Sequence, residues 1–152
     1  TLDYDARFIK LAGEINTSMP KHIVHLITNG LNRSKKSLNG SKILLIGVAY
    51  KKDIDDFRES PALDIIELLS QSGSKISYYD PFIPSLIYND IKLESLDGLR
   101  NESLNSFDAC AIITDHSNVD YTTICKNSNV IIDTRNVFKD SNEEHIIRLG
   151  ES

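Results

Sequence analysis

Short apolar runs that alternate with helical segments constrain the fold of this chain more than any other feature of its sequence. We predict strands at 42–48, 75–79, 109–114 and 130–133, with a small edge strand at 145–149. A helix begins at Ser60-Pro61, where serine caps the end and proline fits the first turn, and ends near Gly73. A shorter helix is expected at 121–126. This order predicts an α/β fold, a Rossmann-like doubly wound parallel sheet with right-handed crossovers.

A long helix precedes the predicted sheet. Its apolar residues recur at spacings of three and four: Phe8, Leu11, Ala12, Ile15, Met19, Ile23, Leu26, Ile27 and Leu31. Pro20 lies inside this pattern, so we expect either a kink or two abutting helices. The apolar stripe needs a partner to cover it, and we interpret the helix as a piece of a larger protein. We expect 82–107 to be irregular, with a short helix around 95–104.

Composition argues against several classes of protein. The 152 residues suit one domain with a core of its own, and 40% hydrophobic with 26% charged residues is ordinary for a soluble globular protein. The net charge of −5 argues against nucleic-acid binding, and no apolar run is long enough to span a membrane. Cys110 and Cys125 lack the spacing of a metal or redox site, and Cys110 lies in a core-like run. We expect a cytoplasmic protein.

Side chains that could bind a ligand follow the predicted strands. Ligands of doubly wound sheets bind outside the carboxyl ends of the strands. The loop at 47–60 is rich in charge, and its Lys51 and Arg58 would converge with Arg135 at this edge, which suits an anionic ligand. The loop has a single glycine, so it is not the glycine-rich cradle of a dinucleotide site. The alternative is that the loop is only a solvated connection, whose carboxylates pair with its cations.

Two motifs resemble those of a known family. The loop at 47–61 reads GVAYKKDIDDFRESP and resembles the signature G-x-A-[aromatic]-K-x-[DN]-x-D-D-x-R-x-S-P of the UDP-binding, C-terminal domain of the UDP-glucose/GDP-mannose dehydrogenase family. The segment at 133–136, DTRN, resembles that family's second C-terminal arginine motif. Ala6-Arg7, Asn16 and Met19-Pro20 resemble the end of its central dimerisation helix. The similarity is closest to the branch that oxidises UDP-N-acetylglucosamine or UDP-N-acetylmannosamine for surface polysaccharides.

The resemblance implies an enzyme of which this chain is one part. Members have an N-terminal NAD-binding Rossmann domain, a helical middle and a C-terminal UDP-sugar domain. They oxidise the sugar C6 alcohol to a carboxylate through thioester chemistry on a cysteine in a G-G-x-C-[FL]-P-K-D motif. That motif and the G-x-G-x-x-G element are both absent from this sequence. We therefore expect 1–35 to end the dimerisation region, 36–152 to be the UDP-sugar domain, NAD to be bound mainly outside this chain, and the chain alone to be inactive.

The same resemblance assigns roles to individual residues. Tyr50, Lys51 and Arg135 are expected to contact the UDP-sugar, and Arg58 the NAD held by the missing domain. No residue of the chain is expected to be catalytic or to bind a metal. The carboxylates of the loop are expected to orient its cations; they are Asp53, Asp55, Asp56 and Glu59. A structural role is favoured over ligand contact for His116, while Lys52 and Asp80 are expected to be solvated or structural.

Two other functions stay open on the sequence alone. The chain could be a free-standing nucleotide-sugar-binding or regulatory domain without chemistry. It could also be an interaction domain that dimerises through the stripe at 8–31. A homodimer is expected for the complete enzyme. The identity of the sugar, whether N-acetylglucosamine, N-acetylmannosamine or glucose, does not follow from these residues.

Overall fold

A computed structural model describes the backbone of residues 2–149 and the side chains of residues 18–149. The elements are α1 (Leu2–Arg33), β1 (Lys42–Ile46), α2 (Pro61–Gln71), β2 (Lys75–Tyr79), β3 (Ser85–Tyr88), β4 (Ile91–Glu94), α3 (Asn101–Ser106), β5 (Ala109–Ile112), α4 (Tyr121–Asn127), β6 (Ile131–Asp133) and β7 (Ile146–Arg148). Five strands form a parallel sheet in the order β2-β1-β5-β6-β7. The predicted Rossmann-like parallel sheet is confirmed, including the edge strand near the end of the chain.

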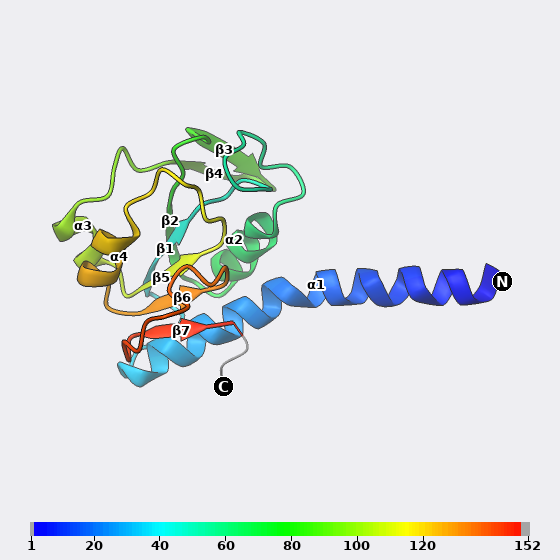
Figure 1. Ribbon diagram of the computed structural model, residues 1–152, viewed down its shortest axis with the longest axis horizontal. Coiled ribbons are helices and arrows are strands. Elements are labelled where there is room, and N and C mark those ends of the chain that lie inside the picture. The colour runs from blue at the N-terminus through cyan, green and yellow to red at the C-terminus, as the bar shows by residue number, and fades with distance from the viewer. Residues whose placement is uncertain (1, 150–152) are drawn as a thin grey trace.

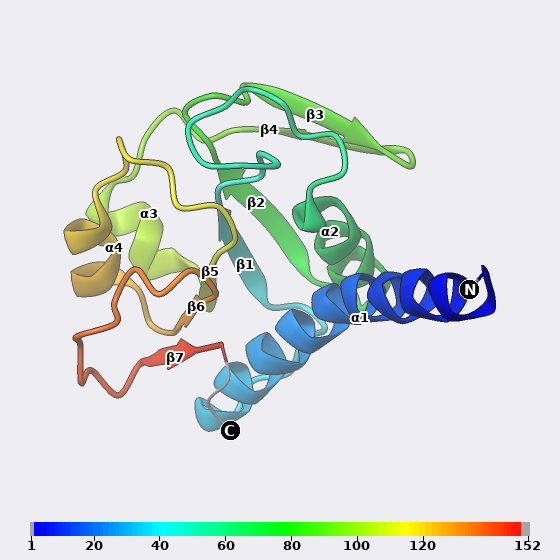
Figure 2. The same ribbon diagram turned by 45° about the vertical axis from the view of Figure 1, so that its right-hand side comes forward.

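Helices cover both faces of this sheet. Figures 1 and 2 show α1 and α2 on one side and α3 and α4 on the other. Alternate strand residues point to the two sides, so Ile43 and Leu45 pack with α1 and α2, whereas Leu44 and Ile46 pack with α3 and α4. Burial on both faces explains why the strands read as unbroken apolar runs. Within the described residues, no helix combines the length and apolar character that a membrane span requires.

The long helix α1 is partly a core element. It runs unbroken through Pro20, so the sequence forms one helix rather than two abutting ones. Its second half buries Ile23, Leu26, Ile27 and Leu31 in the same hydrophobic cluster as the sheet. The expectation that a partner must cover the whole stripe is therefore wrong for this half. The side chains of Phe8, Leu11, Ala12 and Ile15 lie outside the described residues, and the first half of α1 extends beyond the sheet (Figure 1).

The segment at 82–107 differs from the prediction. It contains an antiparallel hairpin, β3 paired with β4, instead of irregular chain. The turn is Asn89-Asp90, and both residues have positive φ, 48° and 69°, which asparagine and aspartate tolerate in tight hairpin turns. The helix expected around 95–104 is α3, and it begins later, at Asn101. The hairpin lies at the carboxyl end of the sheet, above β2 in Figure 2.

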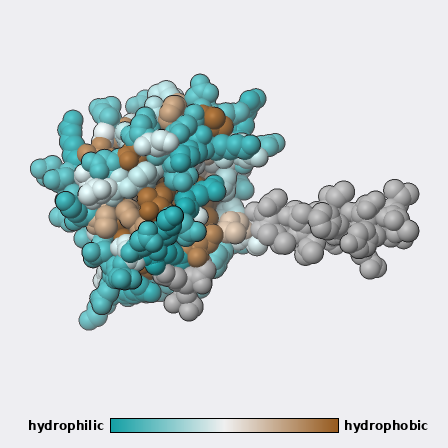
Figure 3. All heavy atoms as spheres, viewed as in Figure 1, coloured by the Kyte–Doolittle hydropathy of each residue, from teal (hydrophilic) through white to brown (hydrophobic). Residues whose placement is uncertain are grey.

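The chain turns sharply where β1 ends. Gly47 has a φ of 81°, and a Cβ at this position would lie 2.2 Å from the carbonyl oxygen of Thr114. Only glycine permits both the backbone angle and this approach. The loop after β1 is thereby brought against the end of β5, at the edge where the sequence predicted a ligand site. Hydrophilic residues cover most of the face of the described part seen in Figure 3, with hydrophobic residues in small groups between them.

Candidate functional site

A buried aspartate organises the carboxyl edge of the sheet. Asp80 directly follows β2, and its side chain is inaccessible to solvent. One carboxylate oxygen, Oδ2, accepts hydrogen bonds from the backbone N–H groups of Val48 and Ala49, at 2.8 and 3.1 Å. The other, Oδ1, accepts from the backbone N–H of Phe82 at 2.8 Å. These contacts tie the start of the loop after β1 to the end of β2. Of the two roles expected for Asp80, solvated or structural, the geometry agrees with the structural one.

His116 links the same carboxylate to the middle of the loop. Its ring is fully buried, with Nε2 2.9 Å from Asp80 Oδ2 and Nδ1 2.8 Å from the backbone N of Asp53. Because the N–H of Asp53 donates, Nδ1 must accept, and the proton of a neutral ring then sits on Nε2 and is donated to Asp80. Phe82 packs on the ring, with centroids 4.8 Å apart. The structural role favoured for His116 agrees with this geometry.

Asp53 contacts the neighbouring loop rather than a cation. Its Oδ1 accepts from the backbone N of Ser117 at 2.8 Å, and its Oδ2 from the Ser117 hydroxyl at 2.6 Å. These hydrogen bonds from Ser117 are the main cause that holds the pKa of Asp53 below its ordinary value. The Asp53 carboxylate is therefore bonded to Ser117 and not directly to a lysine or arginine of its own loop. It joins the loop after β1 to the loop after β5.

Tyr50 and Lys51 lie on the outer side of this framework. The backbone N of Tyr50 donates to the carbonyl of Asp56 at 2.7 Å, which closes the loop on itself. Tyr50 is 42% exposed, and the Lys51 ammonium lies 5.6 Å from the centroid of its ring, within cation–π distance. Lys51 is exposed as well. An aromatic ring and a cation are thus presented together to solvent at this edge.

Arg58 is paired within the loop. Its Nε and Nη2 each lie 3.0 Å from a carboxylate oxygen of Asp56, and its side chain is 82% exposed. The hydrogen bonds from Arg58 lower the pKa of Asp56, and those to Asp56 raise the pKa of Arg58. The expectation that a loop carboxylate orients a cation is met by this pair. The guanidinium has further N–H groups that face solvent.

Arg135 stands at the end of a different strand. The buried carboxylate of Asp133, the last residue of β6, accepts from the backbone N–H groups of Arg135, Val137 and Phe138. The Arg135 Nε donates to the carbonyl of Ile113 at 2.9 Å, which places the guanidinium over the end of β5. All the predicted site residues therefore follow strands at one sheet edge. Because β5 lies between β1 and β6, the guanidinium of Arg135 is brought towards the loop after β1 only by leaning across β5.

The two cysteines are poor candidates for covalent chemistry. Cys110 is fully buried in β5, and burial raises the pKa of its thiol to about 12. Burial, followed by the charge of Glu143, raises the pKa of the Cys125 thiol. Because the thiolate is the nucleophile, both environments disfavour the reactive form. Among the side chains of residues 18–149, no group of three or more histidine, cysteine, aspartate or glutamate residues could hold a metal ion.

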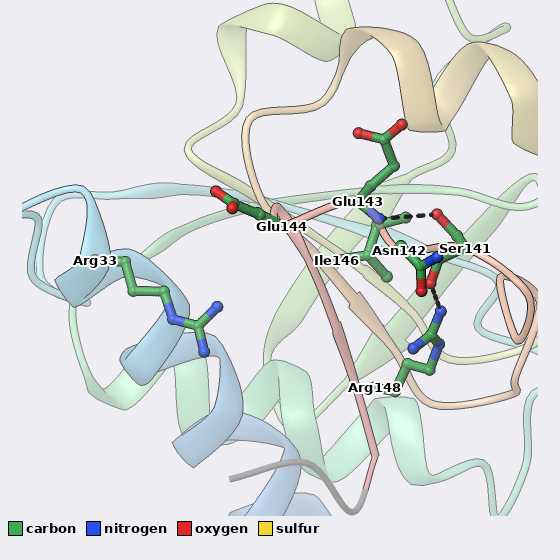
Figure 4. A pocket seen from close by; sticks show the side chains of 7 residues that line it. All are labelled: Arg33, Ser141, Asn142, Glu143, Glu144, Ile146 and Arg148. Atoms are coloured by element: carbon green, nitrogen blue, oxygen red, sulfur yellow. Dashed lines mark hydrogen bonds between the residues drawn. The ribbon is translucent and has the colours of Figure 1, made fainter.

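A surface hollow lies elsewhere, between the end of α1, the loop before β7 and β7 itself (Figure 4). Its lining residues are Arg33, Ser141, Asn142, Glu143, Glu144, Ile146 and Arg148. Within it, the Arg148 guanidinium donates to the backbone carbonyls of Phe138 and Ser141. Arg148 therefore braces the loop between β6 and β7. None of the residues predicted from the sequence to bind a ligand lines this hollow.

Comparisons with known proteins agree with the motifs. A family model described as the UDP-glucose/GDP-mannose dehydrogenase family, UDP binding domain, matches residues 44–140. The UDP-N-acetyl-D-mannosamine dehydrogenase of Methanococcus maripaludis S2 is 30% identical over 145 residues, covering 90% of this chain and 32% of that protein. The Campylobacter jejuni protein of the same name is 36% identical over 117 residues, covering 74% of this chain and 27% of that protein.

Solved structures show the same fold. The UDP-D-ManNAc dehydrogenase of Pyrococcus horikoshii superposes with a TM-score of 0.76 at 29% identity, over 94% of this chain and 33% of that one. A UDP-N-acetyl-mannosamine dehydrogenase from S. aureus superposes with a TM-score of 0.71 at 31% identity, over 98% of this chain and 34% of that one. This chain spans about a third of the length of the relatives it matches.

Proposed function

This chain belongs to the UDP-glucose/GDP-mannose dehydrogenase family, and we propose that it holds the UDP-sugar of an NAD-dependent 6-dehydrogenase. The proposed substrate is a UDP-N-acetylhexosamine, with UDP-N-acetylmannosamine favoured by the names of its relatives. The proposed reaction oxidises the C6 alcohol to a carboxylate in the synthesis of surface-polysaccharide precursors. The complete enzyme is proposed to be a homodimer that uses the region of α1.

The observation that carries this proposal is that, at the carboxyl ends of the strands, the buried carboxylates are bonded within the protein while the cations are exposed. The buried carboxylates of Asp80 and Asp133 are satisfied by the protein's own N–H groups. In contrast, Lys51 and Arg135 are exposed, and each has further donors directed to solvent. Cations above a neutralised framework attract an anionic ligand, and a diphosphate matches both the ammonium of Lys51 and the planar guanidinium of Arg135. The Tyr50 ring offers a surface for a ring of the same ligand.

The residues of this chain do not fit the pyrophosphate of a dinucleotide. In a dinucleotide fold, the first N–H groups after β1 cradle that anion. Here Val48 and Ala49 donate to the Asp80 carboxylate instead, so an internal anion takes the place of the external one. We therefore propose that NAD is bound mainly by residues outside this chain. The part proposed for this chain is one contact from Arg58, whose guanidinium Asp56 already orients.

The proposal is tested by titrating UDP into the chain and its variants in a calorimeter. A charge-assisted contact to a ligand anion contributes about 1.5 to 3 kcal/mol. Lys51→Ala and Arg135→Ala should each weaken UDP binding by about 10- to 150-fold, at about 1.4 kcal/mol per decade. Lys52→Ala is the matched control, because Lys52 is exposed in the same loop, and it should change the affinity by less than about threefold.

Melting temperatures accompany each titration, because lost folding would imitate lost binding. The loop is only a solvated connection if Lys51→Ala and Arg135→Ala bind UDP as Lys52→Ala does. A separate assay addresses chemistry. The chain alone should reduce no NAD with UDP-N-acetylmannosamine, because Cys110 is buried and neither cysteine stands in the family's cysteine motif. Reduction that disappears in Cys110→Ala or Cys125→Ala would contradict this expectation.

A further inference from the structure

We propose that His116 is a positioning residue for the segment of residues 48–53, the ligand segment, and acts on Lys51 through the backbone of Asp53. The idea rests on the proposed function, because it concerns the same UDP site. His116 itself is fully buried. Its effect on a ligand must therefore pass through the groups that its ring contacts.

The ligand segment is fastened at both ends. At its start, Val48 and Ala49 donate to Oδ2 of Asp80. At its end, the backbone N–H of Asp53 donates to Nδ1 of His116. The residues between these two attachments are exposed, and they include Tyr50 and Lys51. Fixing both ends of so short a segment limits the positions that the Lys51 Cα can take.

One imidazole joins the two attachments. Its Nε2 is 2.9 Å from the same Asp80 oxygen that receives Val48 and Ala49, while its Nδ1 receives Asp53. The ring thus donates at Nε2 and accepts at Nδ1, as only the neutral Nε2–H tautomer does. A glutamine side chain lacks a rigid ring with a nitrogen on each side, so it satisfies one neighbour and leaves the other unpaired. Phe82 and the hydrogen bond from Tyr121 to the His116 carbonyl fix the ring and its backbone.

The backbone of Asp53 shows why the second attachment matters. Its φ is 61°, in the left-handed region, which aspartate and asparagine enter at a lower cost than most residues. The contacts from Asp53 to Ser117 and His116 hold this conformation. Without them the segment has other conformations available, and the apparent affinity for a ligand falls by the fraction of molecules that keep the competent one. If that fraction drops to about a tenth, UDP binds about tenfold more weakly.

Three substitutions test the idea by UDP titration. His116→Gln and Asp53→Gly should each weaken UDP binding by about five- to tenfold. Asp53→Gly tolerates the positive φ but lacks the carboxylate that contacts Ser117, whereas Asp53→Asn keeps an acceptor and should stay within about twofold of the wild type. His145→Gln is the control, because His145 donates to the carbonyl of Cys125, far along the chain from the ligand segment.

A double-mutant cycle separates positioning from general damage. If His116 acts on the ligand through Lys51, His116→Gln should weaken binding much less in a Lys51→Ala background than in the wild type. Equal effects in both backgrounds would mean that His116 only stabilises the fold. If His116→Gln does not fold, nitrogen-15 spectra of the wild type decide, because both Asp53 variants keep the backbone N–H that donates to His116 and so test only the contact with Ser117.

A spectroscopic measurement needs no ligand. Nitrogen-15 spectra of the chain should show His116 protonated at Nε2 and unprotonated at Nδ1, with the Asp53 amide protected from hydrogen exchange. The opposite tautomer, or a rapidly exchanging Asp53 amide, would overturn the proposal whatever the ligand. If the wild type shows this tautomer and protection but binds no UDP, the proposed function fails while the attachment of the segment stands.

Discussion

Strand β1 has an aspartate beside each of its ends. At its start, Asp108 Oδ2 accepts from the backbone N of Lys42 at 2.8 Å, and Oδ1 pairs with the ammonium of Lys36. At its end, Asp80 accepts from Val48 and Ala49 and pairs with a histidine. The Asp108 side chain is 20% exposed and its lysine partner 48%, whereas Asp80 and its partner are fully buried.

The difference teaches which end of the sheet carries the site. Water can replace part of the hydrogen bonding that Asp108 offers to Lys36 and Lys42. These contacts therefore add little to the free energy of unfolding. The Asp80 side chain is inaccessible to solvent, so the N–H groups around it depend on its two oxygens. The buried carboxylate of Asp80 binds backbone N–H groups of the loop after β1 and so fixes the shape of that loop. Its cations are then left to face outwards.

The largest difference in the free energy of unfolding is expected between a variant without the Asp80 carboxylate and one without the Asp108 carboxylate. Asp80→Ala leaves the N–H groups of Val48, Ala49, Phe82 and His116 without their partner, and should lower the free energy of unfolding by about 3 to 5 kcal/mol. Asp108→Ala should lower it by less than about 1 kcal/mol. Urea denaturation of both variants measures the contrast. Similar losses at the two ends would break the comparison.

Two glycines sharpen the comparison further. Gly40 lies just before β1 and Gly47 just after it, with φ values of 84° and 81°. A Cβ on Gly40 meets nothing within 4 Å, whereas one on Gly47 meets the Thr114 backbone. Gly40→Ala should therefore cost about 1 to 2 kcal/mol for its left-handed angle alone. Gly47→Ala adds about 1 to 3 kcal/mol for crowding.

The same denaturation curves give the costs of both glycine variants. Equal costs would show that the loop after β1 shifts freely away from β5. Such freedom would contradict a preorganised site. A preorganised site is supported if Gly47→Ala loses more free energy of unfolding than Gly40→Ala, and if the folded molecules of Gly47→Ala bind UDP more weakly than the wild type.

The smallest effect concerns pH and the exposed pair. The hydrogen bond from Lys36 is the main cause that lowers the pKa of Asp108. A carboxyl whose pKa is lower in the folded state stabilises the fold fully above its unfolded pKa, near 3.9. The advantage of the wild type over Asp108→Asn should be under about 1 kcal/mol at pH 7 and should disappear as the pH falls below about 4, through the lowered pKa. Urea midpoints at several pH values would show an unchanged difference if the pair were irrelevant.

The sheet could be predicted from the sequence, whereas the polar framework beneath the site could not. The strands are buried on both faces, so local composition marks them. The hairpin was missed because its strands have four residues each and its Asn89-Asp90 turn lacks the glycine of a stronger signal. Local pairs such as Asp56 with Arg58 follow from sequence proximity.

Contacts between distant residues explain the remaining differences. Asp53 pairs with Ser117, 64 positions along the chain, and Asp80 with His116, 36 positions along. No periodicity reports such a contact, because it depends on which strands become neighbours. The burial that distinguishes Asp80 from Asp108 is likewise a property of the assembled sheet. The roles of Tyr50, Lys51, Arg58 and Arg135 stay predictions, and the UDP titrations test those of Lys51 and Arg135.

The hairpin also bears on aggregation. A sheet with a long unpaired edge strand can recruit strands from other molecules. Here the last part of β2 is bonded on its outer side by the chain that leaves β4, through the Tyr78–Ser95 bridge and the bond from Leu96 to Tyr78. At the opposite edge, β7 has only three residues. The short edge strand β7 and the partly occupied edge strand β2 both discourage the addition of strands from other molecules.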